Sequence, residues 1–226
     1  MKKLFYAIPT FIALVLFACN GNEVKDSISK IRFINASSIS GDINVFIDYN
    51  KVFATDIVYL SFSLFTEHIA TTHTIQIKTA SGSLIKEMAL DMVENKTYSI
   101  FVYDSMNTTR VKLIEENFSV AQGSYCKLRF LHLSNNAPAT DVTQGTDTNI
   151  LFSNYSNGDL SDYTIFPIDS VYFNAHNTGI ASPYYTQPRY NKFKAGNFYT
   201  MCLKGNQGST GIDSLGFFII ENNATY

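Results

Sequence analysis

One stretch of the sequence occurs twice, and this repetition constrains the fold more than any other feature. Residues 30–37, Lys-Ile-Arg-Phe-Ile-Asn-Ala-Ser, return at 127–134 as Lys-Leu-Arg-Phe-Leu-His-Leu-Ser. Further matches follow in the same order: 41–45 with 139–142, 95–100 with 196–201, and 114–117 with 219–222. Ordered matches at a nearly constant offset indicate an internal duplication, so we expect two copies of one unit. The boundary between them is predicted near Gln122 and Gly123.

Within each unit, apolar side chains alternate with polar ones. Ile75 and Ile77 alternate with Gln76 and Lys78, and turn-forming residues such as 80–83, Ala-Ser-Gly-Ser, separate runs of this kind. Short alternating strands between frequent turns are typical of β-sandwiches of about 100 residues. The sequence therefore predicts an all-β protein of two tandem immunoglobulin-like antiparallel β-sandwich domains, at residues 30–122 and 123–226. Residues 84–92 also allow a short helix by their apolar spacing, but a strand is favoured because the linking turn is short.

Composition and charge narrow the class of protein. The chain is 46% hydrophobic and 14% aromatic, enough to bury a core, so it is not a disordered stalk. Its formal net charge is −2, and its basic residues are scattered rather than clustered. Since phosphate binding requires clustered lysine and arginine, we expect no nucleic-acid partner.

The first residues have the composition of an export signal. Lys2 and Lys3 precede an apolar run over 4–17, and Ala18 stands directly before Cys19. The run is shorter than the roughly 20 residues of a membrane span. The pattern resembles the bacterial lipobox, in which cleavage precedes a lipid-modified cysteine. We therefore expect a cleaved signal peptide at 1–18, lipidation of Cys19, and a polar tether at 19–29 that binds the membrane through its lipid. An ordinary cleaved signal or a chance Ala-Cys pair is the alternative.

Lipidation would place the protein in the cell envelope, as an outer-membrane lipoprotein. Whether it faces the periplasm or the cell exterior stays open. Two cysteines would then remain, Cys126 and Cys202. In alternating strands Cys126 shares a face with apolar residues, whereas Cys202 lies opposite Met201 and Leu203. Two unpaired thiols are therefore favoured over a disulfide, which stays the alternative.

Residues 129–142, Arg-Phe-Leu-His-Leu-Ser-Asn-Asn-Ala-Pro-Ala-Thr-Asp-Val, carry a family likeness. They resemble the opening of the bacterial domain of unknown function 4397: a strand ending in His or Asn, a Ser, an Ala/Pro turn and an Asp-Val strand. The first copy fits more loosely, with Asn-Ala-Ser at 35–37 and no Ala-Pro. The resemblance implies a two-sandwich envelope protein with no known activity, so it supplies neither catalytic residues nor a cofactor.

Four short sites share the pattern Asp-Ser-apolar, which resembles the acceptor motif for protein O-glycosylation in Bacteroidetes. Their serines are Ser27, Ser105, Ser170 and Ser214. Ser27 and Ser105 are expected to be the most accessible. The alternative is that Asp-Ser is simply favourable turn chemistry.

The titratable residues give weak signals for catalysis or metal binding. His68 and His73 differ by an odd number, so on one strand they would point to opposite faces. Glu115 and Glu116 are adjacent and would also point apart. His132 could pair with Asp141 across a turn, but a structural histidine that closes the first strand is favoured, because Asn35 stands in its place in the first copy. We therefore expect no catalytic residue and no metal site.

The segment 180–190 is longer in the second copy than in the first. It contains two prolines together with Tyr184, Tyr185, Arg189 and Tyr190. Rigid aromatic side chains beside an arginine suit binding to a glycan or a protein ligand. The alternative is that these tyrosines cover the end of the sandwich.

The expected function is a non-enzymatic role in binding, adhesion or envelope structure. A small envelope hydrolase using His132 and Asp141 is the alternative.

Overall fold

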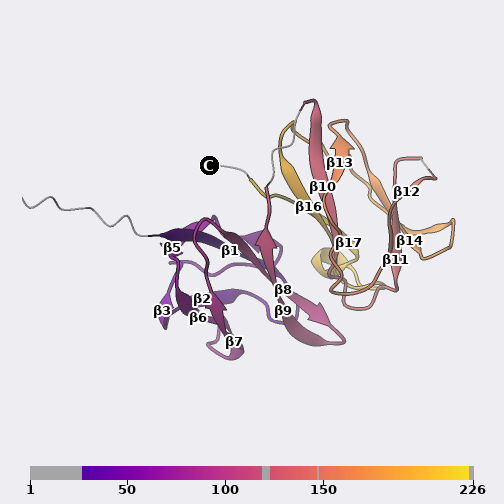
Figure 1. Cartoon of the computed structure of the whole chain (residues 1–226). Coiled ribbons are helices and arrows are strands. Elements are labelled where there is room, and N and C mark those ends of the chain that lie inside the picture. Colours follow the sequence, from indigo (N-terminus) through magenta and orange to yellow (C-terminus); the bar gives the residue numbers. More distant parts are fainter. Residues whose placement is uncertain (1–26, 119–122, 147, 224–226) are drawn as a thin grey trace, which may run out of the picture.

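The computed structural model describes residues 27–118, 123–146 and 148–223 (Figure 1). The described residues form β-strands and one short 3₁₀ helix, Gly211–Asp213, and they confirm the predicted all-β class. No helix in these ranges is both long and apolar enough to cross a membrane. The strands form four sheets arranged as two tandem β-sandwiches. Cys19 and the signal-peptide residues lie outside the described ranges.

The first sandwich pairs sheet A with sheet B. Sheet A contains β1 (Ile28–Ala36), β4 (Ser61–Phe62), β5 (Thr66–Ile69), β8 (Thr97–Ser105) and β9 (Thr108–Glu116). Sheet B contains β2 (Ile43–Ile47), β3 (Asn50–Lys51), β6 (Thr72–Thr79) and β7 (Leu84–Asp91). The strand predicted at 84–92 is thus confirmed as β7. Isoleucines of β1, β2 and β6 and aromatic residues of β1 and β8 form the core between the two sheets.

The second sandwich has the corresponding strand order. Sheet C contains β10 (Tyr125–His132), β13 (Thr164–Pro167), β16 (Phe198–Lys204) and β17 (Gly216–Glu221). Sheet D contains β11 (Thr140–Gln144), β12 (Ile150–Tyr155), β14 (Phe173–Asn177) and β15 (Pro183–Thr186). Its core is rich in phenylalanine, with Phe130, Phe166 and Phe173 fully enclosed.

One strand pair in each inner sheet is parallel, β1 with β8 and β10 with β16. All other pairs between named strands are antiparallel. Parallel partners need a long crossover, and here the intervening strands of sheets B and D supply it. The alternating pattern could not reveal this, because alternation sets which face a side chain takes and not the direction of its strand.

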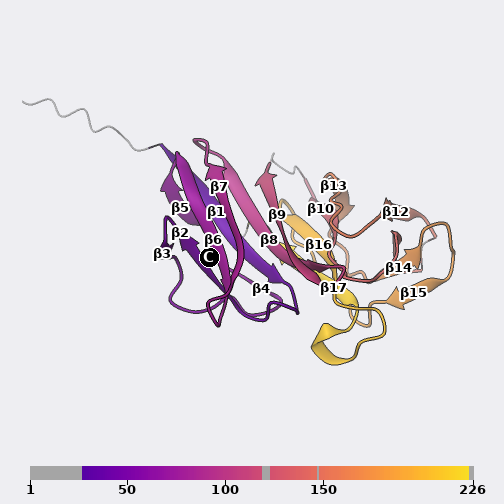
Figure 2. The same cartoon turned by 90° about the horizontal axis from the view of Figure 1, so that it is seen from below.

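The two sandwiches meet through their inner sheets (Figures 1 and 2). A separate apolar cluster joins them, with Ile34, Phe101 and Ile114 from sheet A and Cys202 and Ile220 from sheet C. The order of layers is therefore B, A, C, D. Figure 1 shows sheet D on the side of the molecule opposite the first described residues.

Two buried arginines cross this junction. Arg129 of β10 donates from Nε to Thr200 Oγ1 at 2.8 Å and from Nη2 to Glu116 Oε1 of the first sandwich, also at 2.8 Å. The ring of Tyr163 lies 4.6 Å from its guanidinium carbon.

Arg32 of β1 makes the reciprocal contacts. It donates from Nε to Ser99 Oγ at 2.9 Å and from Nη2 to Asn222 Oδ1 of the second sandwich at 2.6 Å, and its guanidinium lies over Phe65. Each arginine thus reaches an acceptor on the other sandwich. We name Arg32, Arg129, Glu116 and Asn222 the arginine clasp.

The side-chain directions expected for the cysteines and glutamates are confirmed. Cys126 lies in the second core and Cys202 in the junction, and both are free and buried. Burial raises the pKa of the Cys202 thiol to about 12, which keeps it protonated. Glu116 is buried in the clasp, while Glu115 pairs with Lys96 at the surface.

Candidate functional site

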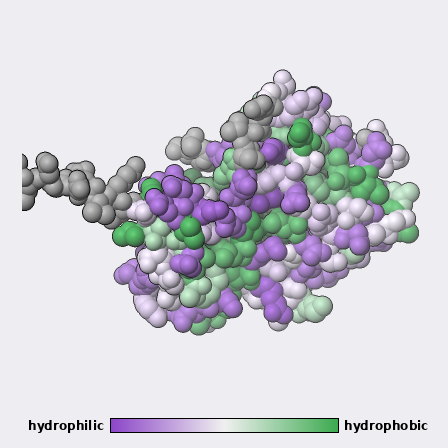
Figure 3. Space-filling model, viewed as in Figure 1, coloured by the Kyte–Doolittle hydropathy of each residue, from purple (hydrophilic) through white to green (hydrophobic). Residues whose placement is uncertain are grey.

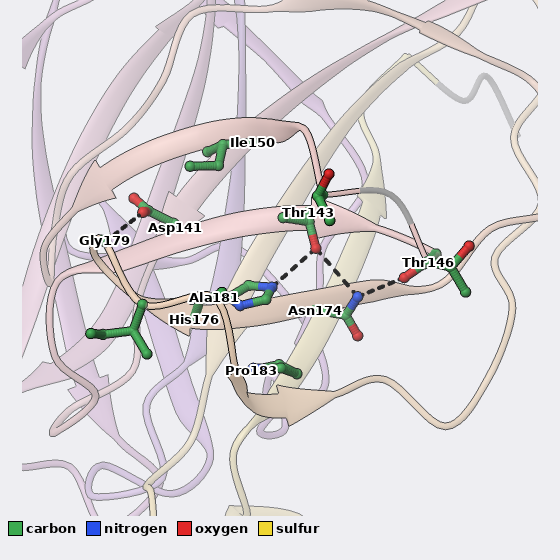
Figure 4. Close-up of a pocket in the computed structure, with 12 residues that line it drawn as sticks. Asp141, Thr143, Thr146, Ile150, Asn174, His176, Gly179, Ala181 and Pro183 are labelled. Atoms are coloured by element: carbon green, nitrogen blue, oxygen red, sulfur yellow. Dashed lines mark hydrogen bonds between the residues drawn. The ribbon is translucent and has the colours of Figure 1, made fainter.

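A cleft of about 400 Å³ lies on the outward face of sheet D, and we name it the outer cleft (Figure 4). Its floor consists of side chains from two neighbouring strands, Asp141 and Thr143 of β11 and Asn174 and His176 of β14. Alternation explains their direction: Val142 and Ala175 point into the core, so these four point away from it. Each floor residue is nevertheless at most 8% exposed. Polar side chains on a solvent-side face are therefore enclosed here rather than solvated.

Hydrogen bonds hold the floor side chains in place. Thr143 Oγ1 lies 3.0 Å from His176 Nε2 and accepts a hydrogen bond from Asn174 Nδ2 at 3.3 Å. Asn174 Nδ2 also donates to the Gly145 carbonyl at 2.7 Å, which fastens the loop after β11. Figure 4 shows these contacts converging on the floor of the cleft.

Asp141 anchors one end of the cleft. Its carboxylate accepts hydrogen bonds from Ser153 Oγ at 2.9 Å, Asn154 N at 2.7 Å and Gly179 N at 2.9 Å. Burial opposes ionisation of Asp141, but the hydrogen bonds from these groups and from the Thr178 side chain outweigh it. The pKa of this carboxyl therefore lies below its ordinary value, and Asp141 is an ionised structural anchor.

The walls of the cleft are mostly apolar. Ile150, Ile180, Ala181 and Pro183 line them together with Thr146 and Thr148, and the two isoleucines are about half exposed. Figure 3 shows apolar surface over the middle of the molecule and on the side of the second sandwich. A polar floor under an aliphatic rim is the usual construction of a small-molecule site.

The first sandwich keeps only half of this floor at the corresponding place, with Asn44 where the cleft has Asp141 and the buried Gln76 where it has Asn174. The registers of β2 with β6 and of β11 with β14 put Phe46 where the cleft has Thr143, and Lys78 where it has His176. Lys78 Nζ lies 4.4 Å from the centre of the Phe46 ring. A lysine–aromatic pair therefore stands where the second sandwich has Thr143 and His176.

The predicted ligand-binding residues of 180–190 divide into two groups. Tyr184 and Tyr185 are half-buried on β15: the Tyr184 hydroxyl bonds Thr140 Oγ1 at 2.6 Å, and the Tyr185 ring packs against Phe217. Arg189 and Tyr190 are exposed. The segment also supplies Pro183 to the rim of the outer cleft, so its role in binding stays a prediction.

His132 and Asp141 make no hydrogen bond to each other in the described structure. His132 is fully buried, and its Nε2 bonds the Pro138 carbonyl at 3.2 Å. Burial lowers the pKa of His132 to about 4, so the ring is neutral at pH 7. This confirms the structural interpretation of His132 and removes the geometric basis for a hydrolase built on this pair.

The serines predicted for O-glycosylation lie in different surroundings. Ser170 is exposed between β13 and β14, whereas Ser27, Ser105 and Ser214 are half-buried. The expectation that Ser27 and Ser105 are the most accessible is therefore wrong, since Ser105 belongs to β8. Modification of any of the four stays a prediction.

The interpretation of His68 and His73 was also wrong. They do not share a strand: His68 is on β5 and His73 on β6, and the turn between them brings the ring centres to 5.8 Å. His73 lies between Asp48 Oδ2 at 2.6 Å and the Ile69 carbonyl at 2.8 Å. Burial opposes protonation, but both acceptors raise the pKa of His73 above its ordinary value. Among the described residues, no group of three or more His, Cys, Asp or Glu could hold a metal ion.

Sequence reasoning missed Thr143, Asn174 and His176. Polar residues that alternate with a core face look like an ordinary solvent-facing surface, so period two alone could not single them out. Comparison of the two sandwiches could have found Thr143 and His176, since Phe46 and Lys78 at the corresponding places differ from them in chemistry, but not Asn174, which corresponds to the amide Gln76.

A model of the family described as Domain of unknown function (DUF4397) matches residues 29–143. This range covers the first sandwich and continues through β10 and most of β11. No curated protein matches the chain.

Three solved structures show weak likeness. The N-terminal domain of AlgF from P. aeruginosa is 14% identical, with a TM-score of 0.31 over 41% of this chain and 96% of that one. The family CBM26 module CBMbc from Eubacterium rectale Amy13K, in complex with maltoheptaose, is 11% identical, with a TM-score of 0.28 over 87% and 98%. A family 41 carbohydrate-binding module from streptococcal virulence factors is 12% identical, with a TM-score of 0.23 over 75% and 92%. At these TM-scores the likenesses carry no argument about function.

Proposed function

The chain belongs to the family described as Domain of unknown function (DUF4397), and on that premise we propose that it is an exported, lipid-anchored, non-enzymatic binding protein of the cell envelope. Its ligand would occupy the outer cleft. The description of the family names no activity, so the proposal depends on this chain's own residues.

The observation that carries the proposal is the enclosed polar floor of the cleft. Hydrogen bonds fix these side chains in place but leave two polar atoms, Asn174 Oδ1 and His176 Nδ1, without a partner among the described residues, so the floor keeps bonding capacity for a ligand. The first sandwich has the corresponding strands, with Phe46 and Lys78 at two of the four places. Asn44 and Gln76 stand at the other two places, so it is the Thr143 and His176 half of the floor that the fold does not require.

Binding fits the cleft better than catalysis does. Thr143 and His176 form a hydroxyl–imidazole pair, which is the beginning of a nucleophile and its base. A working triad also needs a carboxylate that orients the imidazole. Asp141 lies opposite His176 in the register of β11 with β14, but no hydrogen bond joins them, and its carboxylate accepts from Ser153, Asn154 and Gly179 instead.

The remaining parts of the proposal concern delivery and display. A lipid on Cys19 would hold the chain on the outer membrane through the tether at 19–29, and sheet D lies on the side of the molecule away from the start of β1 (Figure 1). The outer cleft would then face away from the membrane. The exposed Arg189 and Tyr190 would extend the contact surface beside it, and Ser170 is the best-exposed candidate for glycosylation.

The anchor is tested by the variant Cys19→Ala. The wild-type protein is expected in the membrane fraction and the variant in the soluble fraction of the envelope. Membrane association of the variant equal to that of the wild type would contradict lipidation of Cys19.

The cleft is tested on glycan and peptide arrays with the mature chain. Ala181→Trp, on the exposed rim, is expected to fill the cleft and abolish binding while the fold stays intact. The matched control is Lys78→Ala, at the place in the first sandwich that corresponds to His176, and it should bind as the wild type does. Binding unaffected by Ala181→Trp, or no binding by the wild type, would contradict the proposed function. Turnover of a bound compound that requires Thr143 would favour the hydrolase class instead.

A further inference from the structure

The floor of the outer cleft holds one hydrogen-bond acceptor that the protein leaves free. Both donors of the Asn174 amide are used, toward Thr143 Oγ1 and the Gly145 carbonyl. Within the described residues its Oδ1 has no hydrogen-bond partner. Asn174 is 8% exposed and lines the cleft, and both of its amide hydrogens are held, so this oxygen is an acceptor in a fixed place that a ligand in the cleft can reach.

The neighbouring histidine has a second ring nitrogen without a partner. Thr143 Oγ1 accepts from Asn174, and it can either donate to His176 Nε2 or accept from it, because a hydroxyl has one hydrogen and two lone pairs. No described residue bonds Nδ1, so this nitrogen is open to a ligand group that can both donate and accept, as a hydroxyl can. Asn174 and His176 are two residues apart on β14 and share a face, with side chains about 7 Å apart along the strand.

The charge of the cleft selects against anions. The carboxylate of Asp141 is ionised and already accepts hydrogen bonds from Ser153, Asn154 and Gly179. Neither lysine nor arginine is among the residues that line the cleft. A negatively charged ligand would meet a fixed negative charge with no cation to offset it, so an uncharged ligand is favoured.

The shape of the cleft selects for a compact ligand with an aliphatic face. The walls of Ile150, Ile180 and Pro183 can cover C–H groups, and about 400 Å³ holds a small molecule rather than a long chain. A peptide that bound by strand addition would need a free sheet edge. The cleft lies on the face of the sheet instead, where most backbone groups of a peptide would find no partner.

We propose that the outer cleft binds an uncharged saccharide unit through two neighbouring hydroxyl groups. One hydroxyl donates to Asn174 Oδ1, the other forms a hydrogen bond with His176 Nδ1, and the C–H face of the ring packs against Ile150 and Ile180. The inference rests on the proposed function and names the ligand class of the same site.

The experiment titrates the full mature chain with three probes: methyl glycosides of neutral hexoses, the corresponding hexuronic acids, and a dipeptide amide. Side-chain amide signals of Asn174 and ring signals of His176 are followed by NMR. Neutral glycosides are expected to shift both sets of signals and to saturate, and uronic acids to bind at least about ten-fold more weakly.

Two variants sharpen the result. His176→Ala should weaken glycoside binding roughly three- to ten-fold, the range for one lost hydrogen bond, and a deoxy glycoside that lacks one of the two hydroxyls should lose a similar factor on the wild type. Ala181→Trp should abolish binding without touching the floor. The control Lys78→Ala should change nothing.

The two ways of failing are distinguishable. If the dipeptide amide or a uronic acid shifts Asn174 and His176 and the neutral glycosides do not, the saccharide inference is overturned while the cleft stays a binding site. If array binding survives Ala181→Trp, the proposed function itself fails.

Discussion

His132 and Asn35 occupy corresponding positions at the ends of β10 and β1. Both side chains bond a carbonyl of the turn that follows, one through an imidazole and the other through an amide. His132 Nε2 bonds the Pro138 carbonyl, and Asn35 Nδ2 donates to the corresponding Gly41 carbonyl at 2.8 Å. Each closes the turn that leads to the outer sheet. The residue at this position of the family-like segment therefore stabilises a turn and is not part of a catalytic motif.

The exchange of these residues predicts a difference in pH dependence. Below about pH 6.5 the unfolded chain protonates His132, whereas the native state, with a pKa of about 4, does not. The wild-type free energy of unfolding should therefore fall by roughly 3 kcal/mol from this group as the pH drops from about 6.5 to 4. His132→Asn, which copies the first sandwich, should have a flatter profile in urea unfolding. Equal pH profiles would contradict this. The raised pKa of His73 has the opposite effect on the pH dependence of stability, but it is the same in the wild type and in His132→Asn and therefore cancels in the comparison.

At the scale of the element, the same tyrosine holds a turn in both sandwiches. The Tyr98 hydroxyl accepts a hydrogen bond from Val93 N at 3.1 Å, and the Tyr199 hydroxyl accepts one from Lys194 N at 3.0 Å. Both tyrosines are 4% exposed and lie near the start of the long strand that pairs in parallel with its sandwich's first strand. This explains why the sequence repeats a tyrosine there.

Tyr98→Phe and Tyr199→Phe should each lower the free energy of unfolding by about 1 kcal/mol, because each removes a buried hydrogen-bond acceptor and no packing volume. Tyr190→Phe is the matched control, since Tyr190 is exposed and its ring packs on Tyr172. Chemical denaturation measures all three. A loss for Tyr190→Phe as large as for the other two would show that the turn bond is not the cause.

The sequence patterns predicted where strands lie, but they did not predict which strands pair with one another. Alternation located β6 and set the faces of Cys126 and Cys202, because side-chain direction is a local property of a strand, whereas β7 was favoured as a strand only by its short linking turn. Alternation failed for His68 and His73 because a turn separates these residues and places them on different strands. The outer cleft could not be predicted, because it depends on the register between β11 and β14 and on the loops around them, and no local sequence pattern carries that information.

At the scale of the whole molecule, the arginine clasp joins the two sandwiches into one unit. Glu116 is the carboxylate that both arginines approach, at 2.8 Å from Arg129 and 3.6 Å from Arg32. Burial lowers the pKa of Arg32, and Glu116 opposes that shift. Arg32 and Arg129 are adjacent to the repeated Phe33 and Phe130 in the sequence, but their partners across the junction come from strands far away. The sequence therefore indicated the repeated pattern around the two arginines, but not the contacts that these arginines make between the two sandwiches.

Glu116→Gln should lower the free energy of unfolding by roughly 3 kcal/mol, because it leaves two buried guanidinium groups without a carboxylate. The adjacent Glu115→Gln, at the surface beside Lys96, should leave stability essentially unchanged. The wild type should unfold in a single transition. Separate transitions for the two sandwiches in the wild type would contradict their coupling.

The central claim is that the outer cleft of the second sandwich is the ligand site. The most direct measurement is hydrogen–deuterium exchange of the mature chain, with and without the neutral saccharide that binds most tightly on the array. We predict slower exchange at 143–146 and 174–183 and no change at 44–46 and 76–78, the corresponding strands of the first sandwich. Protection confined to the first sandwich, or to the exposed end of the tyrosine segment near Tyr190, would contradict the claim.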